Sequence, residues 1–75
     1  MKTKKFIPTV ASNNTVKLFD ATTGQLHRII NVDGTIVSQP ICLENEMYIT
    51  VQNGNFSSIK YYSLPNGSLK KTQPL

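Results

Sequence analysis

The sequence contains one cysteine and one histidine, Cys42 and His27, and it has no tryptophan. A lone cysteine forms no disulfide within its chain, and one Cys with one His falls short of the four ligands of a structural zinc site. The chain of 75 residues must therefore fold without either kind of cross-link. Because small domains bury a limited share of their surface, a partner commonly stabilises them. We expect self-association or docking on another protein, and no metal or cofactor.

Long apolar runs are also missing. The chain opens with basic residues, as a signal peptide does, but Pro8 and Thr9 interrupt the apolar stretch that follows. No segment approaches the roughly 20 apolar residues of a membrane-spanning helix. With 39% hydrophobic and 16% charged residues, the composition is that of a folded chain. We expect one small soluble domain over residues 1–75, without signal peptide or transmembrane segment, in the reducing cytoplasm.

Acidic residues are few, and we expect them singly at turns or strand ends: Asp20, Asp33, Glu44 and Glu46. No Ser, Cys or Asp lies at a motif spacing that would make His27 a general base. Cys42 lies in an apolar run typical of a buried, inert thiol. The glycines are isolated and open no helix, so they form no phosphate-binding loop. We therefore predict a protein that is not an enzyme, without catalytic, cofactor-binding or metal-binding residues.

Short runs of β-branched and aromatic residues dominate instead, separated by Asn, Gly, Asp and Pro, which is the pattern of strands joined by tight turns. Helical spacing of apolar residues is absent. The pattern predicts an all-β fold, an antiparallel meander of about seven short strands. The expected strands are residues 6–11, 15–20, 26–32, 35–43, 47–52, 57–64 and 68–72.

The chain also contains an internal repeat. Residues 16–26 carry a five-residue strand pattern, a glycine and a leucine that have counterparts 43 residues later, in residues 59–69. Upstream, the Thr-Val pair at 9–10 recurs at 50–51, a spacing of 41 residues. A period of about 40–45 residues is typical of propeller blades. The repeat predicts equivalent inward positions on neighbouring sheets for two pairs: Val16 with Ile59, and Leu18 with Tyr61.

Residues 15–25 resemble the end of a WD repeat, with Phe19-Asp20 in the place of the Trp-Asp dipeptide. Residues 10–16 equally resemble the YVTN-type propeller repeats of bacteria. The resemblance covers nearly the whole chain. It implies about one and a half propeller-like blades, on a scaffold used for protein contacts and without inherited catalytic residues. The alternative fold is a small β-sandwich or barrel.

The repeat comparison finds the strand at 35–43 once, so the first unit lacks a partner strand and begins with the strand at 6–11. Uncovered sheet edges tend to pair with other chains. We therefore predict that contacts with other proteins or copies concentrate on the apolar residues of these two strands: Phe6, Ile7, Val10, Ile36, Val37 and Ile41.

Basic residues outnumber acidic ones, eight against four, which gives a net charge of +4 and permits nucleic-acid binding. Lysines lie near both ends of the chain, with Lys2, Lys4 and Lys5 at the first. The candidate contacts are Lys17, Lys60, Lys70 and Lys71, with Phe19, Tyr61 and Tyr62 interleaved as in a base-stacking platform. The alternative is that the lysines keep strand edges hydrated while the aromatic residues fill the core.

Two functions from different classes follow. The first is a non-enzymatic structural or protein-interaction module that docks on, or assembles into, a larger complex. An accessory, knob-like protein of a phage tail or virion is one such setting, by analogy alone. The second is a small basic binder of nucleic acid or of a host protein that it inhibits. A protein partner or a homo-oligomer is our first expectation, and a membrane is not expected.

Overall fold

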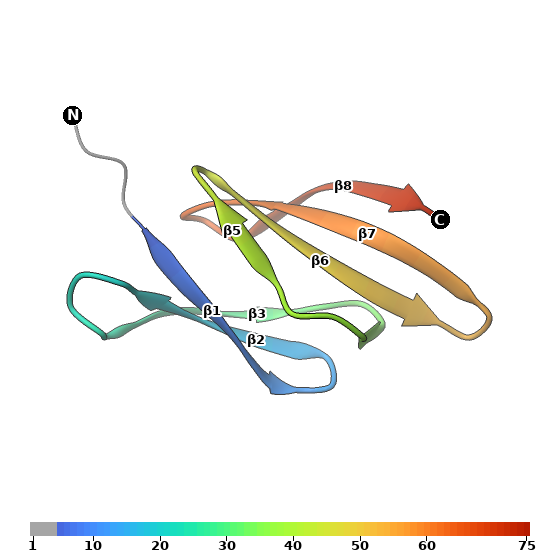
Figure 1. The fold of residues 1–75 in the computed structure, drawn as a ribbon, viewed down its shortest axis with the longest axis horizontal. Coiled ribbons are helices and arrows are strands. Elements are labelled where there is room, and N and C mark those ends of the chain that lie inside the picture. Colours follow the sequence, from blue (N-terminus) through green and yellow to red (C-terminus); the bar gives the residue numbers. More distant parts are fainter. Residues whose placement is uncertain (1–4) are drawn as a thin grey trace.

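A computed structural model describes residues 5–75. All regular secondary structure in that range consists of β-strands (Figure 1). The expected all-β, antiparallel fold is confirmed. Nothing in residues 5–75 resembles a helix that crosses a membrane. The strands, in chain order, are β1 (Phe6–Ser12), β2 (Thr15–Asp20), β3 (Leu26–Asn31), β4 (Thr35–Ile36), β5 (Ile41–Leu43), β6 (Glu46–Asn53), β7 (Phe56–Ser63) and β8 (Ser68–Pro74).

The strands form two antiparallel sheets (Figure 1). In the first sheet, β1, β2 and β3 follow one another as a meander. In the second, β6, β7 and β8 form a similar meander, and β4 and β5 both pair with the remaining edge of β6. The edge strands β1 and β5 lie next to each other where the two sheets meet.

The described chain has eight strands where seven were expected, because the strand predicted at 35–43 is broken. Residues 37–40 separate β4 from β5. The N–H of Val37 still donates to the carbonyl of Thr50 at 3.0 Å, and the N–H of Thr50 donates to Ser38 Oγ at 3.3 Å. Pro40 has no N–H to continue the ladder, so regular pairing resumes after it.

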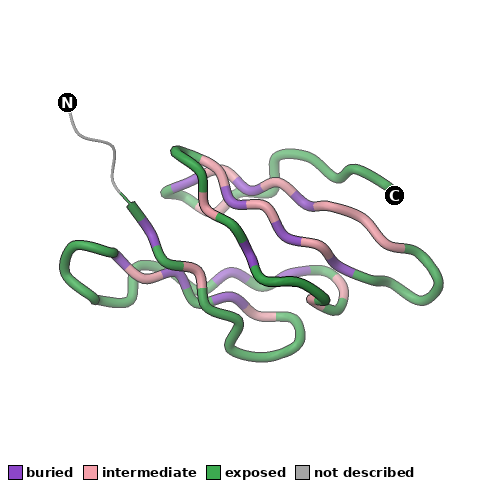
Figure 2. The backbone as a smooth tube through the Cα atoms, in the orientation of Figure 1, coloured by how far each residue is buried: buried purple, intermediate pink, exposed green. Residues whose placement is uncertain are grey.

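One apolar core lies between the sheets. Its centre is formed by five side chains that are at most 1% exposed: Val16, Leu18, Met47, Ile49 and Val51. Figure 2 shows the alternation along β6 that results when every second side chain turns into the core. The rest of the core is Phe6, Ile30, Val32, Tyr62 and Leu64. Burial of apolar surface at roughly 25 cal/mol per Å² holds the two sheets together.

The β7–β8 turn packs closely on β3. A Cβ atom at Gly67 would lie 2.8 Å from Cδ of Arg28, and the φ of +77° at this position strains any other residue, so glycine is favoured here. Nearby, Nε2 of His27 lies 2.9 Å from the carbonyl oxygen of Pro65, and the His27 ring lies 4.8 Å from that of Phe6. Contacts of this kind fix the orientation of the second sheet on the first.

The β2–β3 and β7–β8 hairpins have the same pairing register at a spacing of 43 residues. Leu18 pairs with Arg28 and Tyr61 pairs with Lys71, and in both hairpins a bulge follows immediately. Both turns close alike. Gly24 donates its N–H to the carbonyl of Asp20 at 2.8 Å, Gly67 donates to that of Ser63 at 2.7 Å, and both glycines have a φ of +77°.

The two hairpins nevertheless turn opposite faces to the core. In β2 the buried residues are Val16, Leu18 and Asp20, whereas in β7 they are Lys60 and Tyr62. Since alternate residues of a strand face opposite sides, Ile59 and Tyr61 lie on the outside of the second sheet. The prediction that they share inward positions with Val16 and Leu18 is wrong, although the registers of the strands are equivalent.

The sequence comparison matched residues 9–10 with residues 50–51, but in the structure the equivalent positions are shifted by one residue. Thr9 lies opposite Lys17, whereas Ile49 lies opposite Lys60. The position equivalent to Thr9 is therefore Ile49 and not Thr50. The sequence match missed this one-residue shift because Thr and Val are common strand residues, whereas the register is set by hydrogen bonds along the whole hairpin.

Candidate interaction surfaces

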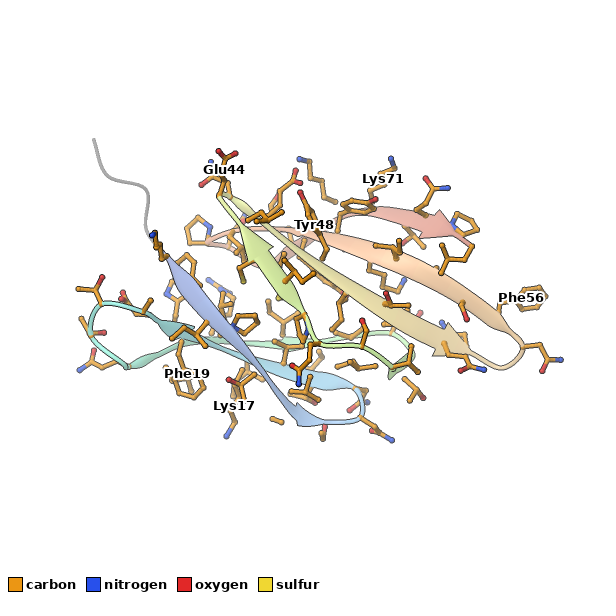
Figure 3. All side chains as sticks on the ribbon, viewed as in Figure 1. Lys17, Phe19, Glu44, Tyr48, Phe56 and Lys71 are labelled. Carbon is orange, nitrogen blue, oxygen red and sulfur yellow. The ribbon has the colours of Figure 1, made fainter. Side chains whose placement is uncertain are left out.

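The first sheet carries three apolar side chains and one lysine on the side away from the core, a surface that we call the first outer face. It consists of Ile7, Lys17, Phe19 and Ile29. In the pairing register Ile7 lies opposite Phe19, and Lys17 lies opposite Ile29, so the four form one compact group. Figure 3 shows Lys17 and Phe19 pointing away from the second sheet. About half of each isoleucine side chain is exposed, so this face offers apolar area around one positive charge.

The second sheet has a corresponding surface on its far side, the second outer face, formed by Ile41, Tyr48, Ile59 and Tyr61. These residues line a shallow hollow of about 480 Å³. The rings of Tyr48 and Tyr61 meet edge to face with centroids 5.1 Å apart. Lys71 places its Nζ 5.3 Å from the centre of the Tyr61 ring. This preformed aromatic surface suits contact with another apolar or aromatic surface.

A polar group borders the second outer face. Tyr48 donates its hydroxyl to Oε1 of Glu46 at 2.9 Å, and Lys70 pairs with Oε2 of the same carboxylate. The hydrogen bonds from Lys70 and then Tyr48 hold the pKa of Glu46 below its usual range. Sharing a hydrogen bond with Glu46 raises the pKa of Tyr48. The carboxylate therefore stays ionised and acts as a fixed acceptor that orients the Tyr48 ring.

The six predicted interface residues lie in different environments. Phe6 is 9% exposed and belongs to the core, and Ile36 is half-buried against it. Ile41 belongs to the second outer face and Ile7 to the first, while Val10 and Val37 are exposed elsewhere. Sequence reasoning missed Ile59 and Tyr61, because their alternation with Lys60 looks like that of core residues. It also missed Ile29, and it named Phe19 only among the aromatic residues of the candidate nucleic-acid surface.

The four predicted nucleic-acid contacts do not share one surface. Lys17 is exposed on the first sheet, whereas Lys70 and Lys71 are exposed on β8 of the second. Lys60 is only 6% exposed, and its Nζ donates to Oγ1 of Thr72 at 3.4 Å within the protein. The interleaved aromatic residues are divided in the same way, since Tyr62 is in the core. Lys2 and Lys4 lie outside the described residues.

The thiol of Cys42 and the carboxylate of Asp20 lie where they stabilise the fold. Burial raises the pKa of the Cys42 thiol, so it stays protonated and weakly nucleophilic at neutral pH. Asp20 accepts hydrogen bonds on Oδ1 from the N–H groups of Thr22 at 2.8 Å and Thr23 at 3.2 Å, which shapes the β2–β3 turn. Across residues 5–75, no three His, Cys, Asp or Glu side chains gather as metal ligands.

No family model matches the sequence, and comparisons with curated proteins and with solved structures find no match either.

Proposed function

We propose that this protein is a non-enzymatic interaction module that assembles with other protein chains through the outer faces of its two sheets. The observation that carries the proposal is the second outer face, where Ile41, Tyr48, Ile59 and Tyr61 line a hollow of about 480 Å³ that no side chain of residues 5–75 fills. Aromatic side chains in a preformed hollow are the typical centres of protein interfaces, because they bury a large apolar area at a small entropic loss.

The size of the protein supports the same proposal. Its core is one layer of side chains between a three-stranded and a five-stranded sheet. Small chains of this kind expose much of their apolar surface, and here apolar residues are exposed on both outer faces. Covering either face would add to the apolar area buried and stabilise the fold. The setting suggested by analogy, a phage tail or virion, stays a prediction, as does the propeller interpretation.

Light scattering during size-exclusion chromatography tests the proposal. We expect the wild-type protein to elute, at micromolar concentrations, above the 8.4 kDa of a single chain. Ile41→Asp, which places a charge on the second outer face, should shift the mass towards one chain. Phe56→Asp is the matched control, because Phe56 is 80% exposed at the tip of the β6–β7 hairpin, away from both faces (Figure 3). Equal behaviour of both variants would place the binding surface elsewhere.

Nucleic-acid binding is a second candidate, which the pair of Tyr61 and Lys71 favours. A tyrosine ring beside a lysine amine, with Lys70 close by, has the composition of a site that stacks a base and holds a phosphate. We expect such binding to lack sequence preference and to weaken steeply with salt. Fluorescence anisotropy with a labelled single-stranded oligonucleotide, for the wild type and Tyr61→Ala, measures it directly.

A further inference from the structure

In the core, the β2–β3 and β7–β8 hairpins pack against each other. Their pairing registers are equivalent, but they meet through opposite faces. The first sheet contributes the face of Val16 and Leu18, and the second contributes the face of Lys60 and Tyr62. By pairing register, Lys60 and Tyr62 are the counterparts of Lys17 and Phe19, which lie on the first outer face. Likewise, the second outer face presents Ile59 and Tyr61, the counterparts of Val16 and Leu18. Each outer face is thus equivalent to a face that the same chain already buries.

We propose that the partner of this protein is a second copy of the chain, whose second outer face docks on the first outer face of its neighbour. Such a head-to-tail contact repeats between chains the packing that already joins the two sheets within each chain. The inference rests on the proposed function and names its partner. Because the two surfaces differ, every docked copy leaves one of each free, and the assembly grows until it closes as a ring or extends as a filament.

The side chains support this contact. Tyr62 lies in the same core as Val16 and Leu18, so its counterpart Phe19 would lie over Ile59 and Tyr61 at the border of the hollow. Around it, the half-exposed Ile7 and Ile29 would meet Ile41, which is 55% exposed. The contact therefore joins an aromatic residue to a preformed hollow and covers aliphatic residues on both sides.

Lys17 would be covered by this contact, and the chain already contains a lysine in that situation. Its counterpart Lys60 lies between the two sheets, with its aliphatic stem in the core and its Nζ near Thr72 Oγ1. A long lysine side chain can bury its stem while its amine reaches a polar group at the margin. The positive charge on the first outer face therefore does not prevent docking.

The β2–β3 and β7–β8 turns are consistent with this head-to-tail contact. Gly67 lies against Arg28 and Ile30 of the first sheet, whereas Gly24, its counterpart in the other hairpin, has no atom within 4 Å of the position a Cβ would take. In the proposed assembly the turn that contains Gly24 would lie on β8 of the neighbouring copy. The open space at Gly24 leaves room for this contact.

Two variants that each damage one face test the inference. Phe19→Asp damages the first outer face and Tyr61→Asp the second, and an unpaired charge in a covered interface should weaken docking by about 100-fold or more. Each variant alone should be monomeric by light scattering. An equimolar mixture should give a complex of one copy of each, because one intact face of each kind remains. This complex should not grow further.

The outcomes separate the possible arrangements. If one variant alone assembles like the wild type, the contact joins identical faces and the head-to-tail inference is wrong, while self-assembly itself stands. If the mixture stays monomeric although the wild type assembles, the faces do not pair and the inference is wrong. If the wild type is monomeric throughout, both the inference and self-assembly fail. Ile29→Asp and Ile41→Asp repeat the experiment at more exposed positions, in case either first variant unfolds, as circular dichroism would show.

Discussion

Leu18 and Tyr61 hold the same place in two hairpins that lie 43 residues apart, yet Leu18 is fully buried while Tyr61 lies on the outside of its sheet. Both residues pair with a basic residue of the following strand, Arg28 or Lys71, just before a bulge. The difference lies in which side of the hairpin meets the other sheet. Because the two sides are exchanged between the hairpins, the chain has one free surface of each kind.

Alanine substitutions should reveal this exchange in the free energy of unfolding. Leu18→Ala removes a fully buried side chain and should cost about 2–5 kcal/mol. Tyr61→Ala loses an edge-to-face contact with Tyr48 at the surface, worth about 1 kcal/mol. Urea unfolding followed by circular dichroism, in dilute solution where assembly does not contribute, measures both values. Equal losses at the two positions would mean that the hairpins do not bury opposite faces.

Lys60→Met should leave the protein as stable as the wild type or slightly more stable. Methionine has a similar length, and replacing a buried charge by a well-packed apolar side chain is often neutral or stabilising, by about 1–4 kcal/mol. Lys17→Met, at the equivalent exposed position, is the control and should change the free energy of unfolding by less than about 0.5 kcal/mol. A loss above about 2 kcal/mol for Lys60→Met would show that the lysine amine has an essential partner.

The pH dependence of Glu46 should follow from its hydrogen bonds. Because Lys70 and Tyr48 lower its pKa in the folded state, the carboxylate contributes stability that is fully present above the ordinary Glu pKa of 4.5. This contribution is lost as the pH falls through the lowered pKa. NMR titration of the Glu46 side chain should show a pKa that rises on Lys70→Gln and rises less on Tyr48→Phe. An unchanged pKa in Lys70→Gln would show that the pair is absent in solution.

Salt should separate the two candidate functions. Each copy carries a net charge of +4, so neighbouring copies repel one another, and salt should strengthen or leave unchanged an assembly driven by apolar burial. Binding to a nucleic acid should instead weaken as salt rises, since it releases counterions. Sedimentation and anisotropy measured between low and moderate salt give the two slopes. Assembly that dissolves with added salt would contradict an apolar interface.

The strand positions were predictable because each strand keeps its own alternation of side chains. At residues 16–18 an apolar, a basic and an apolar residue alternate, so the inward side of Val16 and Leu18 can be read from the sequence. At residues 59–63 both sides carry large residues, and the lysine at 60 suggests the wrong side. Tyr62 and Leu64 project from the same side of the strand, and their burial turns that side towards the core. Lys60 lies on this side as well and is buried with them.

The break between β4 and β5 and the position of the surfaces were less predictable. Pro40 interrupts a segment with strand-forming residues at both ends, so the sequence alone does not locate the end of β4. Phe6 was expected at an interface because its strand has a free edge. It lies in the core because β1 turns that side chain towards the second sheet, near His27. Such placements depend on how the sheets pack, which one strand does not encode.

A structure of the assembled protein, by crystallography or electron microscopy, would show whether the second outer face of one copy docks on the first outer face of the next. The decisive observation is the residue of the neighbouring copy that contacts Tyr61. We expect Phe19, with Ile7 and Ile29 around it, in a contact that repeats the packing between the two sheets of one chain. Tyr61 in contact with Tyr61 of the next copy across a two-fold axis, or exposed to solvent in the assembly, would contradict it.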